Sequence, residues 1–427
     1  MIKNKIACTL LGLCYVFIAQ AQQQLTDTIA GFPVNYSEAH VGKYNLPDPL
    51  VFNDGKVVPN PNGWQQKRRQ ELLDFFEEYQ FGRIPANAIT TASWQLIEEN
   101  RSAKSNKAIR KQVRVYLSDD KTQSVNVLYY LPKQVKEKTP LLLHIAFQAN
   151  NRAVDDSAIQ AAYIYNKAGE RTLAPAQAPQ VPLDSLLAAG IGFATFYYGD
   201  IEPDYKHAIR KEGIRHHLLG AEKKRIKPDA WGAIAAWAWG TQRIIDCLSQ
   251  DPEIDNKRIA LFGVSRLGKT ALWTSASDSR IKLTIASCSG EGGAALSRRD
   301  FGESISHMTD TSRYYYQFAP NRHQYANNAA AFPVDAHELI ALIAPRPLLL
   351  QTGDEDYWSD PKGEYLAAQA AAPVYHLFGI KGLSDTFPRS GDTTSTFQPL
   401  GYYMHAGGHG TVRSDWNIFI TYLQKFL

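Results

Sequence analysis

The chain has 427 residues, 44% of them hydrophobic and 21% charged, which is the composition of an ordinary globular protein. Its formal net charge is +4, of which Lys3 and Lys5 supply two charges, and no basic run indicates binding to nucleic acid. This length allows two or three domains, or one large α/β domain.

The first 21 residues have the layout of a cleavable export signal. Lys3 and Lys5 give a positively charged start, residues 6–18 an apolar core, and residues 19–21 the Ala-Gln-Ala pattern of a cleavage site. The apolar core is too short to span a bilayer comfortably. We therefore predict that residues 1–21 are a signal peptide and that the protein is secreted or periplasmic, without a membrane partner.

Four cysteines are present, and two of them, Cys8 and Cys14, fall within the signal. Cys14 follows Leu13, which is bulkier than the residue that lipoprotein processing prefers, so we do not expect a lipid anchor. Cys247 and Cys288 remain in the mature chain, which is large enough to form a core without a disulfide. We therefore expect two buried free thiols.

Helical and strand patterns alternate along the mature chain. Residues 64–80 place apolar side chains among charges as an amphipathic helix does, and residues 112–117 and 124–130 alternate like two antiparallel strands. A long Ala- and Trp-rich helix is expected at 230–248. Short apolar runs typical of buried strands occupy 140–147, 192–198, 259–262, 281–286, 347–352 and 400–404.

Buried strands that alternate with helical stretches imply a mostly parallel sheet covered on both faces, with ligands bound beyond the carboxyl ends of the strands. No internal repeat and no change of composition marks a second domain. Residues 174–182 and 379–398 are expected to form long surface loops. We therefore predict an α/β protein in which residues 22–427 form one domain with an N-terminal extension.

The most informative stretch is residues 259–272, which read IALFGVSRLGKTAL. An apolar strand breaks at Gly263, Ser265 follows, and a helix-forming segment comes next, which is the layout of a nucleophile elbow. Such a turn raises the serine hydroxyl above the sheet and faces it with the N–H groups of the helix, as acyl transfer requires. The second glycine, Gly268, comes one place later than in the usual Gly-x-Ser-x-Gly pattern. A Ser/Gly loop at a strand end is the alternative.

A serine nucleophile needs a histidine, which in α/β hydrolases follows the last strand and precedes the last helix. The interval 404–410, MHAGGHG, contains two histidines, and the apolar face of residues 414–427 marks the last helix. His409 lies between glycines on the loop itself, where its ring can reach Ser265, whereas His405 continues the strand. We therefore favour His409 as the base.

The acid that orients the histidine should follow the preceding strand, 347–352, and three carboxylates do so: Asp354, Glu355 and Asp356. Asp356 has the reach expected of a hydrolase acid, and at least one of the three must be an ordinary solvated turn residue. Because the order serine, acid, histidine agrees with the expected order of elements, we assign Asp356.

Five segments resemble the bacterial glucuronoyl esterases, carbohydrate esterase family 15. They are GVSRLGK at 263–269, GEGGAALSRRDFGE at 290–303, HELIALIAPRPLLL at 337–350, DYWSDPKGEY at 356–365 and GGHG at 407–410. The resemblance covers essentially the whole mature chain. It implies an α/β-hydrolase fold, a three-layer sandwich around a mostly parallel sheet, and a serine hydrolase that uses no metal and no cofactor.

The resemblance also implies a role for each matching residue. Ser265 matches the nucleophile and His409 the base, while Arg266 matches the residue whose backbone and guanidinium stabilise the oxyanion. An arginine fork suits a developing oxyanion, and a tryptophan with a lysine suits a polar sugar ring that has an apolar face. The residues that line the uronate subsite are, by the same resemblance, Lys269, Glu303 and Trp358.

One position departs from the family pattern. Fungal and some bacterial members carry a glutamate 23 residues after the serine, where this chain has Cys288, which cannot serve as the acid. Other bacterial members place the acid after the following strand in an Asp-x-Trp pattern, which Asp356 and Trp358 match. Asp356 therefore remains the assigned acid, and Glu291 is the weaker candidate. A glutamine that contacts the sugar in the family has no clear counterpart in this sequence.

The expected reaction is hydrolysis of esters between (4-O-methyl-)glucuronic acid of glucuronoxylan and lignin alcohols by a monomeric enzyme. Two alternatives remain open. One is a broader carbohydrate esterase that acts on acetyl, methyl or feruloyl esters, and the other is a non-catalytic hydrolase fold that binds polysaccharide. The intact serine, acid and histidine count against the second.

Overall fold

The computed structural model describes residues 27–159, 161–175, 181–219 and 226–427. The predicted signal peptide at 1–21 and most of the predicted loop at 174–182 lie outside these residues. Among the described residues, no helix is both long and apolar enough to cross a bilayer. Cys247 and Cys288 are both buried free thiols, as the sequence predicts.

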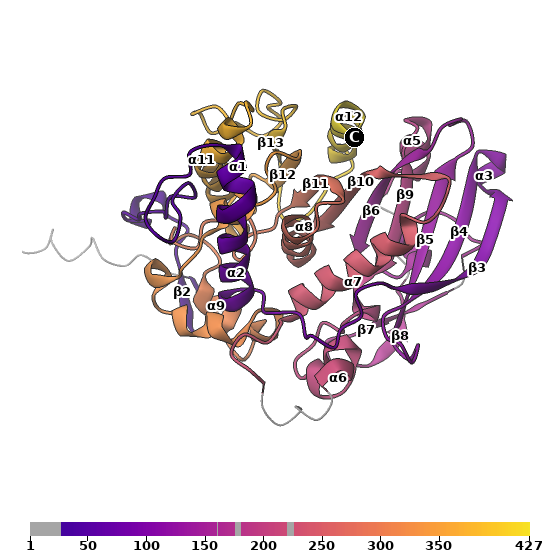
Figure 1. Cartoon of the computed structure of the whole chain (residues 1–427), viewed down its shortest axis with the longest axis horizontal. Coiled ribbons are helices and arrows are strands. Elements are labelled where there is room, and N and C mark those ends of the chain that lie inside the picture. The colour runs from indigo at the N-terminus through magenta and orange to yellow at the C-terminus, as the bar shows by residue number, and fades with distance from the viewer. Residues whose placement is uncertain (1–26, 160, 176–180, 220–225) are drawn as a thin grey trace, which may run out of the picture.

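A nine-stranded sheet forms the centre of the molecule (Figure 1). From one edge to the other its strands are β13 (Leu400–His405), β12 (Leu348–Gly353), β11 (Ile281–Ser287), β10 (Ile254–Val264), β6 (Thr139–Ala146), β9 (Gly192–Tyr197), β5 (Ser124–Pro132), β4 (Ala108–Tyr116) and β3 (Ser93–Ser102). Neighbours pair in parallel from β13 to β9 and antiparallel from β9 to β3. The predicted mostly parallel sheet with an antiparallel start is therefore confirmed.

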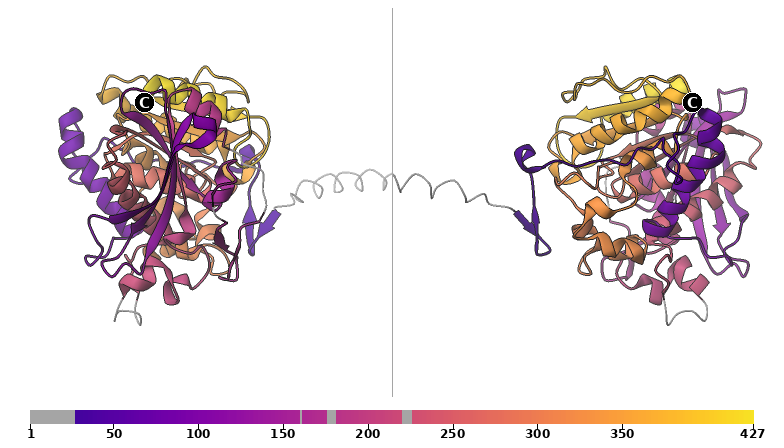
Figure 2. Two further views of the ribbon diagram at one scale, coloured as in Figure 1. Left: turned by 90° about the vertical axis from the view of Figure 1, so that its right-hand side faces the viewer. Right: turned by 60° about the vertical axis from the view of Figure 1, so that its left-hand side comes forward.

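Helices cover both faces of this sheet, and Figures 1 and 2 show the two layers. One face packs against α2 (Arg69–Tyr79), α7 (Ala233–Leu248), α8 (Arg266–Ser277), α10 (Ala336–Ala341) and α11 (Pro361–Leu377). The other face packs against α5 (Leu183–Ala188) and α12 (Asp415–Phe426). Every residue of β9, β12 and β13 is buried, because both faces of these strands are covered.

The remaining elements are short and lie in the connections. The strands are β1 (Asp27–Ile29), β2 (Phe32–Val34), β7 (Tyr163–Tyr165) and β8 (Arg171–Leu173), and the helices are α1 (Pro61–Gly63), α3 (Ala103–Asn106), α4 (Asn150–Ala153), α6 (Gly213–Leu219) and α9 (Ile305–Thr309). A π-helical turn, Trp64–Arg68, joins α1 to α2, so the helix predicted at 64–80 is present and begins slightly earlier. The sequence did not predict β3 or the β7–β8 hairpin.

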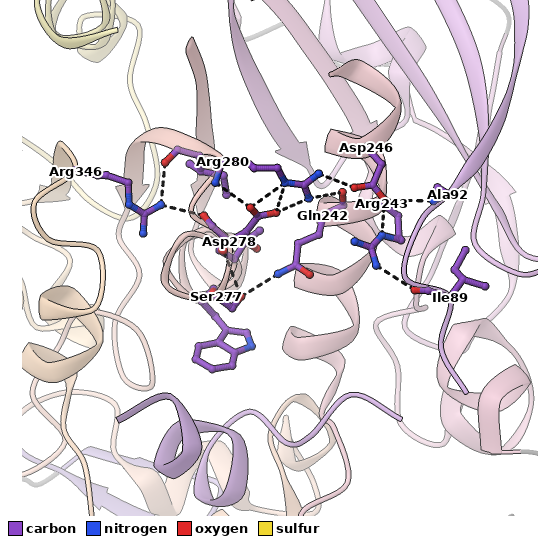
Figure 3. Close-up of polar contacts among 12 residues, drawn as sticks. Ile89, Ala92, Gln242, Arg243, Asp246, Ser277, Asp278, Arg280 and Arg346 are labelled. Atoms are coloured by element: carbon purple, nitrogen blue, oxygen red, sulfur yellow. Dashed lines mark hydrogen bonds and ion pairs between the residues drawn. The ribbon is translucent and has the colours of Figure 1, made fainter. Parts of the chain in front are cut away.

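A network of charged side chains ties α7 to α8 at the end of the sheet where β11 begins (Figure 3). Arg280 donates to Asp246 Oδ1 at 2.6 Å and to Asp278 Oδ2 at 2.6 Å. Arg346, just before β12, donates to the backbone oxygens of Asp278 and Ile281 at 3.0 and 2.8 Å. The network thus fixes the carboxyl end of α8, the helix whose amino end follows Ser265.

Candidate active site

Ser265 stands at the turn between β10 and α8, as the elbow pattern predicts. Its backbone has φ 58° and ψ −128°, a conformation that L-residues rarely adopt, and its N–H donates to Ser287 O at 2.8 Å. Two glycines make the turn possible. A Cβ on Gly263 would lie 2.1 Å from Leu267 O, and one on Gly268 would lie 3.0 Å from Ser287 O. The late second glycine therefore serves the close approach of α8 to β11.

His409 is held by Asp356. The His409 Nδ1–H donates to Asp356 Oδ2 at 2.7 Å, and the carboxylate is buried while 44% of the His409 side chain is exposed. With the proton on Nδ1, the other ring nitrogen, Nε2, is the one free to accept a proton. This is the arrangement that a serine hydrolase needs between its acid and its base.

The two neighbouring carboxylates of the 354–356 turn behave differently. Asp354 Oδ1 accepts the N–H of Gly407 at 2.7 Å, and the N–H of Glu355 donates to Gly407 O at 2.9 Å. The side chain of Glu355 is exposed. The acid turn and the histidine loop are therefore bonded together through backbone and side chain, and Glu355 is the solvated turn residue.

His405, the alternative histidine, is buried below this loop and points to different partners. Its Nδ1 lies 2.8 Å from Asp415 Oδ2 and 2.9 Å from Gln351 Nε2, and its Nε2 lies 3.1 Å from Gly408 O. Its bond to Asp415 raises the pKa of His405 above the ordinary value. His405 therefore supports the backbone of the loop that carries His409.

Glu291, the alternative acid, lies away from the histidine. It is 1% exposed, pairs with Arg322, and accepts a hydrogen bond from the Ser297 hydroxyl at 3.0 Å. Both of these partners come from outside the histidine loop, so the geometry joins His409 to Asp356 and not to Glu291.

Cys288 occupies the place of the family glutamate, and its thiol contacts the histidine loop. Its Sγ accepts the N–H of Gly410 at 3.3 Å and lies 3.4 Å from Gly410 O. Ligand atoms of Cys288, Asp356 and His409 lie within 4.8 Å of one another, as those of a metal site would. Burial, with the nearby Asp356 charge, raises the pKa of the Cys288 thiol. His409 and Asp356 are hydrogen-bonded to each other, and the thiol bonds to the backbone of Gly410, so these three groups already have partners within the site.

One cleft of about 260 Å³ brings together all the residues that the sequence assigns to the site. They are Ser265, Arg266, Lys269, Glu303, Asp356, Trp358 and His409. The cleft lies at the carboxyl ends of β10, β11 and β12, the edge where ligands of parallel sheets bind. Residues that the sequence did not assign complete its wall: Cys288, Met308, Arg313, Tyr314, Gln317 and Ser359.

Arg266 is anchored on one side and open to the cleft on the other. Its guanidinium pairs with buried Asp204 and lies 4.7 Å from the centre of the Tyr314 ring. Asp204 also accepts hydrogen bonds from Tyr198, Tyr316 and Gln317 at 2.8, 2.8 and 3.0 Å. Burial alone would raise the pKa of Asp204, but Arg266 and these hydrogen bonds hold it below the ordinary value.

The residues assigned to the uronate subsite form a connected group. Trp358 Nε1–H donates to Glu303 Oε1 at 3.1 Å, and Lys269 Nζ lies 3.7 Å from Glu303 Oε2. Arg313 lies 3.5 Å from the same carboxylate, and its guanidinium carbon is 5.1 Å from the centre of the Trp358 ring. Burial lowers the pKa of Lys269 and Glu303 opposes this effect. The result is a polar pocket with one aromatic face and a cationic rim.

The sequence did not predict a role in this site for three residues that contribute to it: Asp204, Arg313 and Gln317. Asp204 follows the buried strand β9, so its place after a strand end was a usable signal. Arg313 and Gln317 lie among short helical turns without a motif. Gln317 lines the cleft and donates through Nε2 to Asp204 at 3.0 Å, while its Oε1 is buried and has no hydrogen-bond partner among the described residues.

Comparison with known proteins gives consistent results over most of the chain. A family model described as glucuronyl esterase, fungi, matches residues 162–379. A carbohydrate esterase, MZ0003, from an unknown prokaryotic organism is 37% identical over 404 residues, which is 91% of each chain.

Two solved structures are similar over nearly their whole length. A promiscuous CE15 esterase from a marine bacterial metagenome is 36% identical with a TM-score of 0.83, covering 92% of this chain and 100% of that one. A glucuronoyl esterase from Solibacter usitatus is 34% identical with a TM-score of 0.85, covering 91% of this chain and 99% of that one.

Proposed function

Since this chain belongs to the glucuronoyl esterases, carbohydrate esterase family 15, we propose that Ser265, His409 and Asp356 perform the ester hydrolysis of that family. The observation that carries the assignment is the 2.7 Å hydrogen bond from His409 to buried Asp356, in the same cleft as Ser265. The substrate is the ester that joins the C6 carboxyl of glucuronic acid on xylan to a lignin alcohol.

The reaction proceeds in two steps through an acyl-enzyme. His409 Nε2 takes the Ser265 hydroxyl proton as Oγ attacks the C6 carbonyl, and the same nitrogen returns that proton to the alcohol oxygen when the ester bond breaks. Water then attacks the acyl-enzyme, gives one proton to His409, and releases the uronic acid while Ser265 regains its proton. Asp356 holds the imidazole in the productive tautomer and stabilises its positive charge.

Arg266 supplies charge where the oxyanion forms. Its backbone N–H stands at the start of α8, one residue after the nucleophile, where oxyanion donors lie in this fold. A quarter of its side chain is exposed, in the cleft that also contains Ser265. The pairing with Asp204 fixes the guanidinium before the substrate arrives, so little reorganisation accompanies the reaction.

The sugar ring binds to Lys269, Glu303 and Trp358, with Arg313 and Gln317 as further contacts. These groups offer donors, acceptors and one aromatic face, the combination that a hydroxyl-rich ring requires. Gln317 is the best placed glutamine for the sugar contact known in the family, because it lines the cleft beside Arg313 and Tyr314.

Export fits a polymeric substrate that lies outside the cell. The N-terminal 21 residues have the pattern of a cleavable signal, so we propose a secreted or periplasmic enzyme. We also propose that it acts as a monomer, in which one chain supplies every assigned residue of the cleft.

A turnover assay tests the proposed function. We expect hydrolysis of benzyl glucuronate far above that of 4-nitrophenyl acetate, and a loss on the order of 10⁴-fold or more in S265A with folding intact. Equal turnover of both esters would indicate the broader carbohydrate esterase. No turnover of either by the folded wild type would indicate a polysaccharide-binding protein, and activity retained in S265A would show another nucleophile.

A further inference from the structure

The segment at residues 27–40, which we call the N-terminal strap, packs against the two loops that carry Glu303 and Trp358. It contains β1 and β2, which pair as an antiparallel hairpin, and β2 lies beside α9 (Figure 1). Residues of the strap belong neither to the triad nor to the lining of the cleft. The proposed reaction therefore gives this segment no role.

Backbone hydrogen bonds join the strap to the loop that ends at Glu303. Asn35 Nδ2–H donates to Asp300 O at 2.6 Å, and the Gly302 N–H donates to Asn35 O at 2.8 Å. The Glu303 N–H donates in turn to Trp358 O at 2.8 Å. Gly302 has φ 65°, and a Cβ on it would lie 2.6 Å from Trp358 O, so the loops approach as closely as backbone allows. The positions of the two sugar-binding loops are therefore tied to the strap.

A row of three rings leads from the strap to the aromatic face of the sugar pocket. The Phe32 ring centre lies 5.8 Å from that of His307, and the His307 ring centre lies 5.1 Å from that of Trp358. Both pairs are edge-to-face, at 74° and 69°, a geometry that aromatic pairs favour. His307 is 1% exposed, and its Nδ1 accepts the Ser304 N–H at 3.1 Å, so its ring is held at the start of α9. Trp358 thus packs on a buried ring whose second aromatic neighbour, Phe32, belongs to the strap.

Charged side chains fix the other end of the strap to the start of α11. Glu38 pairs with Arg299 and accepts a hydrogen bond from Lys362 Nζ at 2.9 Å. Arg299 Nε–H donates to Asp360 Oδ2 at 2.9 Å, and Asp360 Oδ1 accepts the Gly363 N–H at 2.9 Å. The strap is therefore anchored on both sides of the segment that carries Trp358.

Other elements hold the reacting groups. Ser265 stands on the turn between β10 and α8, and His409 is bonded to Asp356. A lost strap contact should therefore disturb Glu303 and Trp358 and leave the proton transfers unchanged. Loss of binding that is equal in the ground state and the transition state raises KM without lowering kcat.

We propose that the N-terminal strap is a positioning element of the uronate subsite. Phe32 holds the Trp358 ring through His307, and Asn35 holds the loop of Glu303 through its hydrogen bonds to that loop. This inference rests on the proposed function and adds to its binding site a segment from the start of the described chain.

The test measures kcat and KM for benzyl glucuronate in F32A and N35A, which remove one strap contact each. F32Y is the conservative variant, because it keeps the ring that packs on His307. The matched control is Y163A, which removes a ring from the β7–β8 hairpin, another short antiparallel hairpin. Tyr163 is 53% exposed and does not line the cleft.

We expect F32A and N35A each to raise KM about three- to tenfold, the range that one aromatic pair or one hydrogen bond gives, with kcat within about twofold of the wild type. F32Y and Y163A should keep the wild-type KM. The H307A variant should also raise KM, and adding F32A to it should raise KM little further, because Phe32 acts through His307.

Melting curves show which variants are folded. A wild-type KM in folded F32A and N35A would overturn the inference and leave the proposed function intact, as would a loss confined to kcat. Independent, additive effects of F32A and H307A would also overturn it, and so would loss of folding in both F32A and N35A, which would make the strap a purely structural segment. Failure of the wild type to hydrolyse the ester would instead reject the proposed function.

Discussion

At the scale of single residues, the contact between His409 and Asp356 is the one on which the assigned chemistry depends. D356N should lower kcat by about 10⁴-fold, because an amide that donates to Nδ1 favours the wrong imidazole tautomer. E291Q should cost much less, since Glu291 faces Arg322 and Ser297. Steady-state kinetics on a glucuronate ester measure both. A larger loss in E291Q than in D356N, with both variants folded, would place the acid in the turn after Cys288.

Asp204 acts as a positioning residue for Arg266, and the pair gives a second prediction. R266K keeps the charge but loses the planar fork, so kcat should fall roughly 10²–10³-fold with a smaller change in KM. D204N should change kcat in the same direction, and the double variant should lose little more than R266K alone. Additive losses would show that the two residues act separately. A raised KM with unchanged kcat in R266K would make Arg266 a ground-state sugar contact.

The site residues that the sequence predicts share one property, which is that each lies in a local motif. Ser265, Arg266 and Lys269 belong to the elbow, while Asp356 and His409 follow the last two strands. Arg313 and Gln317 reach the cleft, and Asp204 reaches Arg266, only through tertiary packing, and of the three only Asp204, which follows β9, had a usable signal along the chain. The sequence likewise could not predict that Glu291 pairs with Arg322, and only the structure shows that Glu291 lies away from His409.

At the scale of elements, burial explains which strands the sequence reveals. β6, β9, β12 and β13 are almost entirely buried, and their continuous apolar runs identify them. β3 has the opposite pattern. It is an edge strand with eight of its ten residues exposed. Its apolar residues Trp94, Leu96 and Ile97 lie on the surface, and they are followed by five polar residues, so the strand lacks the continuous apolar run of a buried strand. The β7–β8 hairpin has three residues in each strand, which is too short for any periodicity.

The histidine loop depends on His405, which links the end of β13 to α12 through Asp415. The folded-state pKa of His405 is raised above the unfolded value of about 6.5. Protonation therefore favours the folded state, so this stabilisation is complete below pH ~6.5 and is lost as pH rises through the folded pKa. The difference in free energy of unfolding between wild type and H405Q should be larger at pH 5.5 than at pH 8.5.

Urea unfolding at the two pH values measures this difference. H40Q is the matched control for the substitution itself, because His40 is exposed and far from the loop in sequence. A wild-type advantage over H405Q that grows from pH 5.5 to pH 8.5 would contradict the assignment of His405 as a protonated support.

At the scale of the whole molecule, catalysis and one source of stability lie at opposite ends of α8. Its amino end follows Ser265, and its carboxyl end joins the network around Arg280 (Figure 3). R280A should lower the free energy of unfolding by about 1 kcal/mol, a modest value because 38% of the side chain is exposed and water screens its ion pairs. The kcat should stay within about twofold of wild type.

Urea midpoints and turnover of the same preparations check this separation of roles. K381A removes a cation from an exposed position of the 379–398 loop and should leave both quantities unchanged. A large fall in kcat with little loss of stability in R280A would mean that the network reaches the active site through α8.

Because β13 lies at the edge of the sheet, turnover reports whether this edge of the protein is folded. This strand pairs with β12 alone among the described strands, yet the loop after it carries His409, and α12 then covers the sheet. Edge elements open at lower free energy than the strands at the centre of a sheet. When β13 and α12 detach, Asp356 loses its hydrogen bond to the His409 imidazole, while the turn at Ser265 and most of the backbone pairing of the sheet persist. During gradual denaturation, turnover should therefore be lost before the circular dichroism signal is lost. A sample with a native circular dichroism spectrum can then be inactive.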